Sequence, residues 1–462
     1  MPPSRLAMTP PRTGQDQHPA AAVDDRVRLG GTLVVVVLLV VGGTLASWFR
    51  LPAAARGAVW AEDGRNFIGD RVAEGPLTAV LRVYEGYLHV VPRLIAEVVV
   101  AVAPIDRYAA AMTAASCAVV GLVAGLVFVT ARSVVPAVVP RLALALVPVV
   151  SPAAPLEVLG NAANVHWYLL WATPWVLLSA PRSRIWSWVL AVFVLLAALT
   201  EIQLLLFAPL LLLVLRDRRS WPLGAALLLG GAAQVLATLS APRTDNPNDP
   251  VGAASAVLGF ALNPVAAVTH GESAAVQALV VRDSWWPIAL TAVVVAASAV
   301  FVLLRGDGRG RVAVLVCGGS ASALWLAAVT LNPHPRLRYA ERLADGLPGF
   351  GLERYAVVPS MFLTAVVLLA AALLSRTPGR AGPAGALLAT LVVVVQLLQF
   401  SPAGSWRALG PSWVEEVDAA EAACLQGDDL RELTTAPLRP SGRTPWVVSV
   451  PCDDLLDDRV TP

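Results

Sequence analysis

The amino-acid sequence predicts an all-α polytopic transmembrane protein of about 11–13 helices, with a long first outer loop carrying interfacial helices and a small α/β extracytoplasmic C-terminal tail. The chain of 462 residues is 57% hydrophobic and 14% charged, whereas a soluble domain carries about a quarter charged residues. Apolar segments of about twenty residues, the length of a membrane-crossing helix, recur along the whole chain. The net charge of +2 offers no basic stripe, which argues against a nucleic-acid partner.

The N-terminal 28 residues are polar and rich in proline and arginine, and we expect a disordered cytosolic tail there. Every basic residue in the chain is arginine and none is lysine, a composition that indicates a GC-rich, actinobacterial genome. The apolar run 29–49 is too long for the core of a signal peptide and is the first expected span. The other expected spans are 107–130, 139–156, 164–180, 185–200, 201–215, 221–240, 285–304, 311–331, 355–375 and 383–400.

Two segments are ambiguous. Residues 88–104 form either a short span or an interfacial helix, and residues 251–269 form a weak span or a re-entrant segment. Arginine clusters in short loops set the orientation, because such loops face the cytosol. The clusters fall at 132–141, 182–184, 216–219, 305–311 and 376–380. If 88–104 does not cross the membrane, about eleven spans that cross in alternating directions put all five clusters in the cytosol. The N-terminus is then cytosolic as well.

This alternation divides the chain into three parts. The tail 1–28 precedes a transmembrane core over 29–402, in which 50–106 forms the first outer loop. Residues 403–462 form a small extracytoplasmic segment, with a helix expected at 413–425 and a strand at 444–452. Cys424 and Cys452 both lie there, and in an oxidising exterior they pair, stabilising the tail by roughly 3–4 kcal/mol. The alternative is two free thiols in a disordered tail.

The stretch WAEDGRNF at 60–67 places two adjacent carboxylates, Glu62 and Asp63, just beyond the first span. Neighbouring residues of an extended chain point in opposite directions, so at most one acid faces a substrate and the other orients the loop. Gly64 frees the backbone to turn directly after the acids. The alternative for such a pair is a solvated loop.

Four other outward stretches carry polar residues in an apolar setting. The second outer motif, YEGYLHVVPR at 84–93, gathers Tyr87, His89 and Arg93, and the apolar helix after it holds Glu97. Asn164 and His166 precede an aromatic run, and Glu201 interrupts a long apolar stretch. An arginine cluster at 332–355 goes against the positive-inside trend, and arginine holds phosphate through bidentate hydrogen bonds. Interfacial aromatics, a simple hairpin turn and solvated loops are the alternatives for these stretches.

This layout resembles the GT-C class of membrane glycosyltransferases, which use polyprenyl-phosphate sugars. The resemblance rests on the acidic pair after the first span, the His- and Pro-containing LHVVPRL motif at 88–94, the span number and the C-terminal outer segment. Two features depart from the class pattern: the acids read Glu-Asp where some members have Asp-Glu, and the tail is too small for a large sugar-binding domain.

The resemblance implies a transferase of the cytoplasmic membrane, with its active site outside, that passes a sugar from a lipid-linked donor to a glycan or glycolipid acceptor of the cell envelope. Asp63 would be the general base, and Glu62 an orienting group or a ligand of the divalent metal, Mg or Mn, that some members use. Tyr87, His89 and Arg93 would line the acceptor side. The donor would be held by a second set of side chains, namely Asn164, His166, Arg336, Arg338 and Arg354.

A transporter or flippase for a lipid-linked or amphipathic substrate is the alternative from another functional class. It would use Glu97 and Glu201 as charges at membrane depth. The sequence shows neither the paired broken helices of an inverted-repeat transporter nor a nucleotide-binding P-loop.

Overall fold

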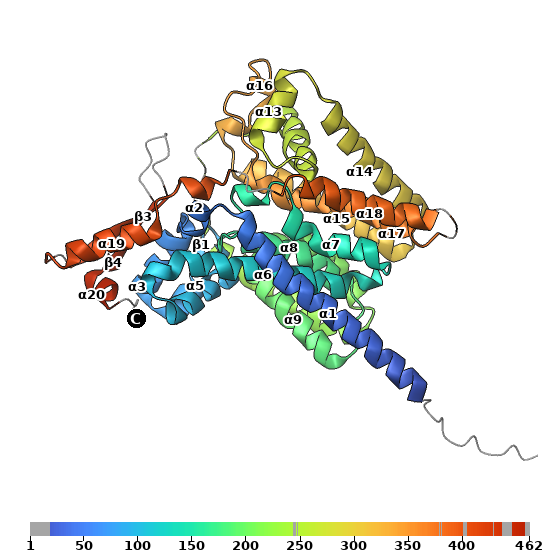
Figure 1. Cartoon of the computed structure of the whole chain (residues 1–462), viewed down its shortest axis with the longest axis horizontal. Helices are drawn as coiled ribbons and strands as arrows, with labels where there is room; N and C mark the ends of the chain where they lie inside the picture. The colour runs from blue at the N-terminus through green and yellow to red at the C-terminus, as the bar shows by residue number, and fades with distance from the viewer. Residues whose placement is uncertain are drawn as a thin grey trace, which may run out of the picture.

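The computed structural model describes residues 19–457 apart from 244–245, 247, 378, 380, 401–403, 428 and 437–445. The chain is mostly helical, with two small antiparallel sheets (Figure 1). Seven helices of the described chain are long and apolar enough to cross a membrane, which makes this a multi-pass membrane protein. They are Gly30–Arg50, Ile105–Ser133, Val138–Leu156, Arg218–Ser240, Trp286–Arg305, Gly308–Leu331 and Arg354–Leu374.

The first helix, α1 (Pro19–Arg50), begins ten residues before the expected span. The expected disordered tail included residues 19–28, which the structure has as helix; alanine and arginine favour a helix there, and Pro19 occupies the first turn that proline tolerates. The rest of that expected tail, residues 1–18, lies outside the described residues.

Helices α1 and α6 (Tyr108–Thr130) pack antiparallel, since Gly43 of α1 meets Gly121 of α6 while Val36 meets Gly125. The loop between them, 51–104, therefore leaves and returns at the same end of the bundle, which we call the loop end. Within this loop α5 (Val90–Val102) spans only about 20 Å, too short to cross a bilayer. This favours the non-crossing interpretation of 88–104. The other loop elements are α2 (Ala53–Arg56), η1 (Asp63–Ile68), α3 (Gly69–Glu74), α4 (Pro76–Leu81), β1 (Val83–Tyr84) and β2 (Tyr87–Leu88).

The remaining long helices complete the bundle around α17 (Val357–Leu374), whose residues are nearly all buried. Trp171 of α8 (Val165–Leu177) stacks against Phe362 of α17 with ring centroids 5.5 Å apart. The other helices of the bundle are α7 (Val138–Val150), α9 (Arg184–Ala198), η5 (Ile202–Leu210), α10 (Leu211–Val214), α11 (Trp221–Ser240), α14 (Trp286–Arg305), α15 (Gly308–Leu331) and α18 (Ala381–Leu397).

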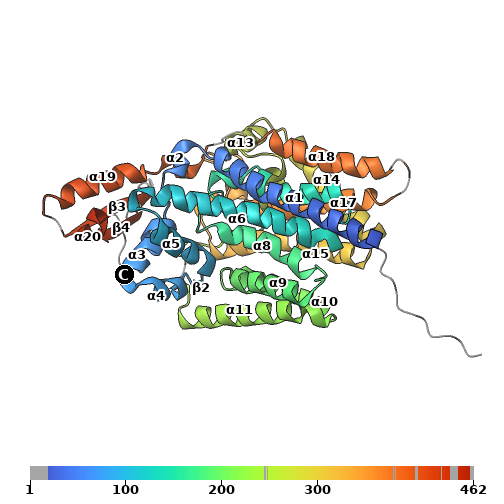
Figure 2. The ribbon, with the colours of Figure 1, turned by 60° about the horizontal axis from the view of Figure 1, so that its bottom comes forward.

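The arginine-rich turns gather at the end of the bundle opposite the loop end, here called the arginine end. Arg376 donates to the carboxylate of Asp307 at 3.1 Å and to the carbonyl of Val134 at 2.5 Å. Ser133 donates to the carbonyl of Leu178 at 2.9 Å, just before the cluster at 182–184. Figure 2 shows the start of α1, α10 and the turn between α17 and α18 on one side, and α3, α4 and α5 on the other.

Residues 253–281 stay at the loop end instead of forming a span. They fold as α12 (Ala253–Phe260), the π-helical turn η7 (Ala261–Val265), η8 (Ala266–Val268) and α13 (Ser273–Val281). Before α12, Asp249 binds Arg338 of the short segment that holds η9 (Pro335–Leu337) and α16 (Tyr339–Arg342). After η8, Gly271 contacts Pro152, which follows α7 at the loop end. Because both ends of this segment lie at the loop end of the bundle, the structure favours the re-entrant interpretation of 251–269.

The C-terminal residues form a small appendage at the loop end, defined here as residues 404–457. It consists of η11 (Trp406–Leu409), α19 (Trp413–Cys424), the hairpin of β3 (Leu430–Ala436) and β4 (Trp446–Pro451), and α20 (Cys452–Leu456). The helix and strand expected from the sequence are confirmed, and β3 is an addition. Cys424 and Cys452 are joined by a disulfide. Figure 1 shows the appendage beside α2 and α3.

Candidate functional site

A cavity of about 320 Å³ lies at the loop end, where residues from six separate parts of the chain meet. Its walls come from the first loop, from the start of α8, from the joint before η5, and from the ends of α11 and α15 with the residues before α17. The lining side chains that carry polar chemistry are Glu62, Tyr84, Glu85, Tyr87, His89, Asn164, His166, Glu201, Gln203, Arg243, Asn332, Arg354 and Tyr355.

The two adjacent acids of the first loop have different surroundings. Glu62 lines the cavity, and the hydroxyl of Tyr84 donates to its carboxylate at 3.3 Å. Burial raises the pKa of Tyr84 above its usual range, so the phenol keeps its proton and remains a donor. Asp63 lies off the cavity and is 2% exposed. Glu62 is therefore the acid that faces the cavity, although the backbone here is helical and not extended as expected from the sequence.

Asp63 anchors the first loop to the segment before α8. Its two carboxylate oxygens accept from the backbone amides of Ala163 at 2.9 Å and Ala162 at 3.3 Å. Tyr108 donates to the carbonyl of Asp63 at 2.9 Å, which fixes the same residue to the start of α6. Burial raises the pKa of Asp63 to about 7, against the opposing effects of Arg407 and the two amides.

His89 is held at the start of α5 by contacts from several elements. Its Nε2 lies 2.8 Å from the carbonyl of Ala163, so Nε2–H donates and Nδ1 carries the lone pair. Burial lowers the pKa of His89 well below the ordinary value, with smaller effects from His166 and Arg93, so the ring is neutral. The Nδ1 lone pair of this neutral ring is buried and has no hydrogen-bond partner in the described part of the chain.

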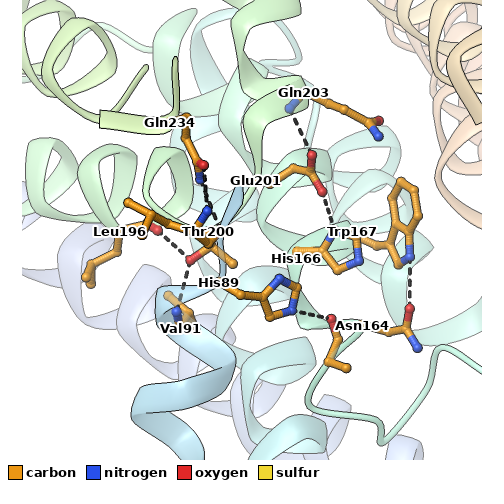
Figure 3. A network of polar contacts seen from close by, with 12 residues as sticks. His89, Val91, Asn164, His166, Trp167, Leu196, Thr200, Glu201, Gln203 and Gln234 are labelled. Carbon is orange, nitrogen blue, oxygen red and sulfur yellow. Dashed lines mark hydrogen bonds and ion pairs between the residues drawn. The ribbon is translucent and has the colours of Figure 1, made fainter. Parts of the chain in front are cut away.

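The segment that carries His89 is pinned to α9 and α11 (Figure 3). The side-chain amide of Gln234 accepts from the amide of Leu88 at 2.8 Å and donates to its carbonyl at 3.1 Å. The amide of Val91 donates to the hydroxyl of Thr200 at 3.0 Å. These bonds place the second motif of the first loop against helices far along the chain.

His166 and Glu201 form a buried pair on the opposite wall, across from His89 (Figure 3). Nδ1 of His166 donates to the carboxylate of Glu201, whose other oxygen accepts from the amide of Gln203 at 2.8 Å. An imidazole whose Nδ1–H is bound by a carboxylate presents a basic Nε2. The rings of His166 and His89 lie 5.4 Å apart between centroids.

The cavity also holds two guanidinium groups, each beside an acid. Arg354 donates to Glu157 at 2.8 Å, and the same oxygen of Glu157 accepts from the indole of Trp60 at 3.4 Å. Arg243 lies 3.8 Å from the carboxylate of Glu85 and also donates to Asn332. Arginine keeps its charge at every physiological pH, so both groups are ready donors for an anionic ligand.

Seven of the residues singled out in the sequence meet at this cavity: Glu62, Tyr87, His89, Asn164, His166, Glu201 and Arg354. The others lie elsewhere in the described chain. Asp63 anchors the loop, Arg93 pairs with Asp70 at 2.8 Å, and Arg338 pairs with Asp249 at 3.0 Å. Arg336 is an exposed residue of η9 off the cavity wall. Glu97, named for the transporter alternative, pairs with Arg71 at 2.9 Å, also off the cavity.

Three functional residues were not part of the glycosyltransferase site expected from the sequence. Glu201 was named only as a break in an apolar stretch and as a charge of the transporter alternative, and its partner His166 is 35 positions away. Glu157 and Arg243 sit at the ends of expected spans, where charged residues are common and carry no signal of their own. Only the packing of helices distant in sequence shows that all three belong to one site.

In the described part of the chain, no three His, Cys, Asp or Glu side chains come close enough together to hold a metal ion. No protein-family model, no curated protein and no solved structure matches this chain. The functional interpretation accordingly depends on the cavity itself.

Proposed function

We propose that this protein is a membrane glycosyltransferase that moves a sugar from a polyprenyl-phosphate donor to a glycan or glycolipid acceptor during cell-envelope assembly. The observation that carries the proposal is the cavity that joins Glu62 of the first loop to Arg354 at the start of a late span. A carboxylate and a guanidinium on one cavity are the two groups that such a transfer needs.

The reaction forms a bond between the acceptor oxygen and the anomeric carbon of the sugar and breaks the bond from that carbon to the phosphate oxygen. Glu62 takes the proton of the acceptor hydroxyl, and the lipid phosphate leaves with the bonding electron pair. Arg354, with Asn164 and His166 nearby on the wall, stabilises the charge that develops on the phosphate. This assigns the base to Glu62 instead of Asp63, because Asp63 is off the cavity and engaged with two amides.

The proposal includes an orientation. About eleven crossings of the cytoplasmic membrane, the seven long helices with α8, α9, α18 and the η5–α10 segment, put the arginine end in the cytosol and the loop end outside. The N-terminus is then cytosolic, and the cavity and the appendage are extracytoplasmic. A lipid-linked donor in the outer leaflet presents its phosphate at this level.

The test compares substitutions of two first-loop acids in the full-length protein. Glu62→Gln is expected to lower sugar transfer from a polyprenyl-phosphate-sugar fraction of the host membrane by roughly 10²–10⁴-fold, the usual contribution of a general base. Glu74→Gln removes a carboxylate that pairs with Arg82 away from the cavity, and it should transfer at the wild-type rate. Arg354→Met should weaken co-purification of polyprenyl phosphate, measured by lipid mass spectrometry. Full activity of Glu62→Gln would show that Glu62 is not the general base.

One observation favours a second candidate, a proton-coupled transporter. The His166–Glu201 pair is buried beside the cavity, and a carboxylate–imidazole pair at such a place can bind and release a proton. Proteoliposomes distinguish the two functions: lipid-linked substrate added to a transporter causes proton uptake that Glu201→Gln abolishes, whereas the transferase releases polyprenyl phosphate without net proton movement across the bilayer.

A further inference from the structure

The residue directly before Glu62 has a strained backbone. Ala61 has a φ of 46°, in the left-handed region that residues other than glycine rarely occupy. Such a conformation costs of the order of 1 kcal/mol or more and persists only where surrounding contacts enforce it. Because Ala61 and Glu62 share a peptide bond, the contacts that hold Ala61 also set the direction in which Glu62 leaves the backbone.

The contacts that hold Ala61 come from the appendage. Strand β3 has a bulge at Thr435, since Thr434 pairs with Val447 and Ala436 pairs with Trp446 while Thr435 has no partner in the ladder. A bulge turns a residue out of its strand. The carbonyl of Thr435 accepts from the amide of Ala61 at 2.9 Å, and its hydroxyl lies 3.3 Å from the carbonyl of Ala61 and 3.2 Å from that of Trp446, between the two segments.

The fit around this turn is close. A Cβ atom at Gly64 would lie 2.3 Å from the methyl group of Thr435, so the turn of the acidic motif is shaped to the bulge. Thr435 is fully buried in this contact. The side chain of Arg65 lies 5.2 Å above the ring of Trp446, which adds a cation–π contact between the same two segments.

A second line of contacts runs from the appendage to the cavity arginine. Trp446 of β4 packs against Trp60, whose indole donates to Glu157 at 3.4 Å. Glu157 in turn accepts from Arg354 at 2.8 Å. The hairpin therefore touches the residues that orient both Glu62 and Arg354, the two groups of the proposed reaction.

The hairpin is itself fastened to the rest of the molecule. The disulfide joins the end of α19 to the residue after β4. Trp413 at the start of α19 donates from its indole to the carbonyl of Ile105, and its amide donates to the carbonyl of Gly57. Leu433, Val448 and Val450 of the hairpin share an apolar cluster with Phe67 and Ile68 of η1. Contacts on both sides thus keep the hairpin seated on the first loop.

From these contacts we infer that the appendage is a clamp that positions Glu62 for reaction, with Thr435 as the positioning residue and the disulfide as its tether. This inference deepens the proposed function and rests on it for its kinetic consequences. Loss of the Thr435 contact alone displaces the Glu62 carboxylate and leaves the bond between Glu157 and Arg354 in place, so it lowers the rate of the chemical step and leaves donor binding unchanged.

The kinetic experiment replaces the hydroxyl of Thr435 and keeps its shape. Thr435→Val should lower kcat by roughly tenfold to a hundredfold with an unchanged KM for the lipid-linked donor, because small misplacements of a reacting group have effects of this size. Thr435→Ser keeps the hydroxyl and should retain most of the wild-type kcat. Thr434→Val is the matched control in the same strand and should behave like wild type. A wild-type kcat in Thr435→Val would overturn the positioning role.

A second measurement needs no activity and separates this inference from the proposed function. Hydrogen–deuterium exchange of the full-length protein in detergent should show faster exchange in peptides covering 57–68 after reduction of the disulfide, or in the Cys424→Ser/Cys452→Ser double variant. Peptides from α17 serve as the unaffected reference. Unchanged exchange in 57–68, with mass spectrometry confirming a reduced disulfide, would overturn the clamp. If the wild-type protein has no transferase activity, the proposed function is overturned, whereas the exchange experiment still tests the clamp.

Discussion

At the scale of single residues, the acidic pair shows what a sequence can and cannot reveal. The sequence predicted that at most one of Glu62 and Asp63 would face a substrate, on the premise of an extended backbone, whereas the structure has both acids at the start of the helical turn η1. The sequence could not show which acid meets the cavity, because the answer depends on the amides of Ala162 and Ala163, about a hundred positions away. The positive φ of Ala61 is equally invisible in the sequence, since alanine carries no signal for that conformation.

The buried Asp63 predicts a specific pH dependence of stability. The folded protein holds the Asp63 proton up to about pH 7, while the unfolded chain releases it near its ordinary value of 3.8. At a pH between these two pKa values, unfolding releases a proton. The free energy of unfolding that Asp63 contributes therefore falls as the pH rises from about 4 to about 7. Asp63→Asn removes the ionisation, and its unfolding temperature in detergent should fall less across this range than that of the wild type.

Comparison of the two proteins isolates the contribution of Asp63 because all other groups are shared. His89 acts in the opposite direction: its lowered pKa costs stability as the pH falls, in both proteins equally. Parallel pH profiles for wild type and Asp63→Asn would show that Asp63 keeps an ordinary pKa in the fold.

At the scale of elements, the positions of the helices follow from apolar runs, but their internal geometry does not. The run 201–215 was expected to be one span, yet it begins as the 3₁₀ segment η5 and continues as the short α10. Glu201 caps this segment through the amide of Gln203, and Pro209 interrupts it. The hydropathy pattern predicts an apolar segment there but does not predict its 3₁₀ geometry.

The contact between α1 and α6 gives a prediction at this scale. A Cβ atom at Gly121 would lie 2.3 Å from the carbonyl oxygen of Val40 and 2.5 Å from the hydroxyl of Thr44. Gly121→Ala should therefore push the two helices apart and cost roughly 1–3 kcal/mol, as overpacking does. The check is the unfolding temperature and the yield of folded protein from the membrane.

The control lies on α1 itself. A Cβ atom at Gly42 meets nothing within 4 Å, so Gly42→Ala should leave stability unchanged or raise it through the better helix propensity of alanine. If Gly121→Ala and Gly42→Ala behave alike, close packing of α1 on α6 does not limit stability. Because α1 and α6 fix where the first loop begins and ends, a shift between them should also move the acidic motif.

At the scale of the whole molecule, the division into two ends was predictable and the composition of the cavity was only partly so. Arginine counts alone placed five turns on one side, and the bonds from Arg376 to Asp307 and Val134 join three of those turns. The cavity, by contrast, needs Glu201 beside His166 and Glu157 beside Arg354. Such pairs arise from helix packing across the bundle, which no local pattern in the chain encodes.

The two ends give the last prediction, the orientation in the membrane. Arg309 is exposed at the arginine end and Glu341 is exposed in α16 at the loop end. Intact cells that express Glu341→Cys should react with a membrane-impermeant maleimide, whereas Arg309→Cys should react only after the membrane is opened. The native cysteines give little background, because Cys117 and Cys317 are buried and the other two form the disulfide. Each variant keeps the remaining arginines, so the substitution itself should not invert the protein.

The reverse labelling pattern would place the cavity in the cytosol. A lipid-linked donor would then have to come from the inner leaflet, and the appendage would sit in a compartment that keeps cysteines reduced. The disulfide tether could not persist there, so the clamp on Ala61 would have to hold through Thr435 and the apolar contacts of the hairpin alone. Orientation, disulfide and donor source are thus linked, and one labelling experiment constrains all three.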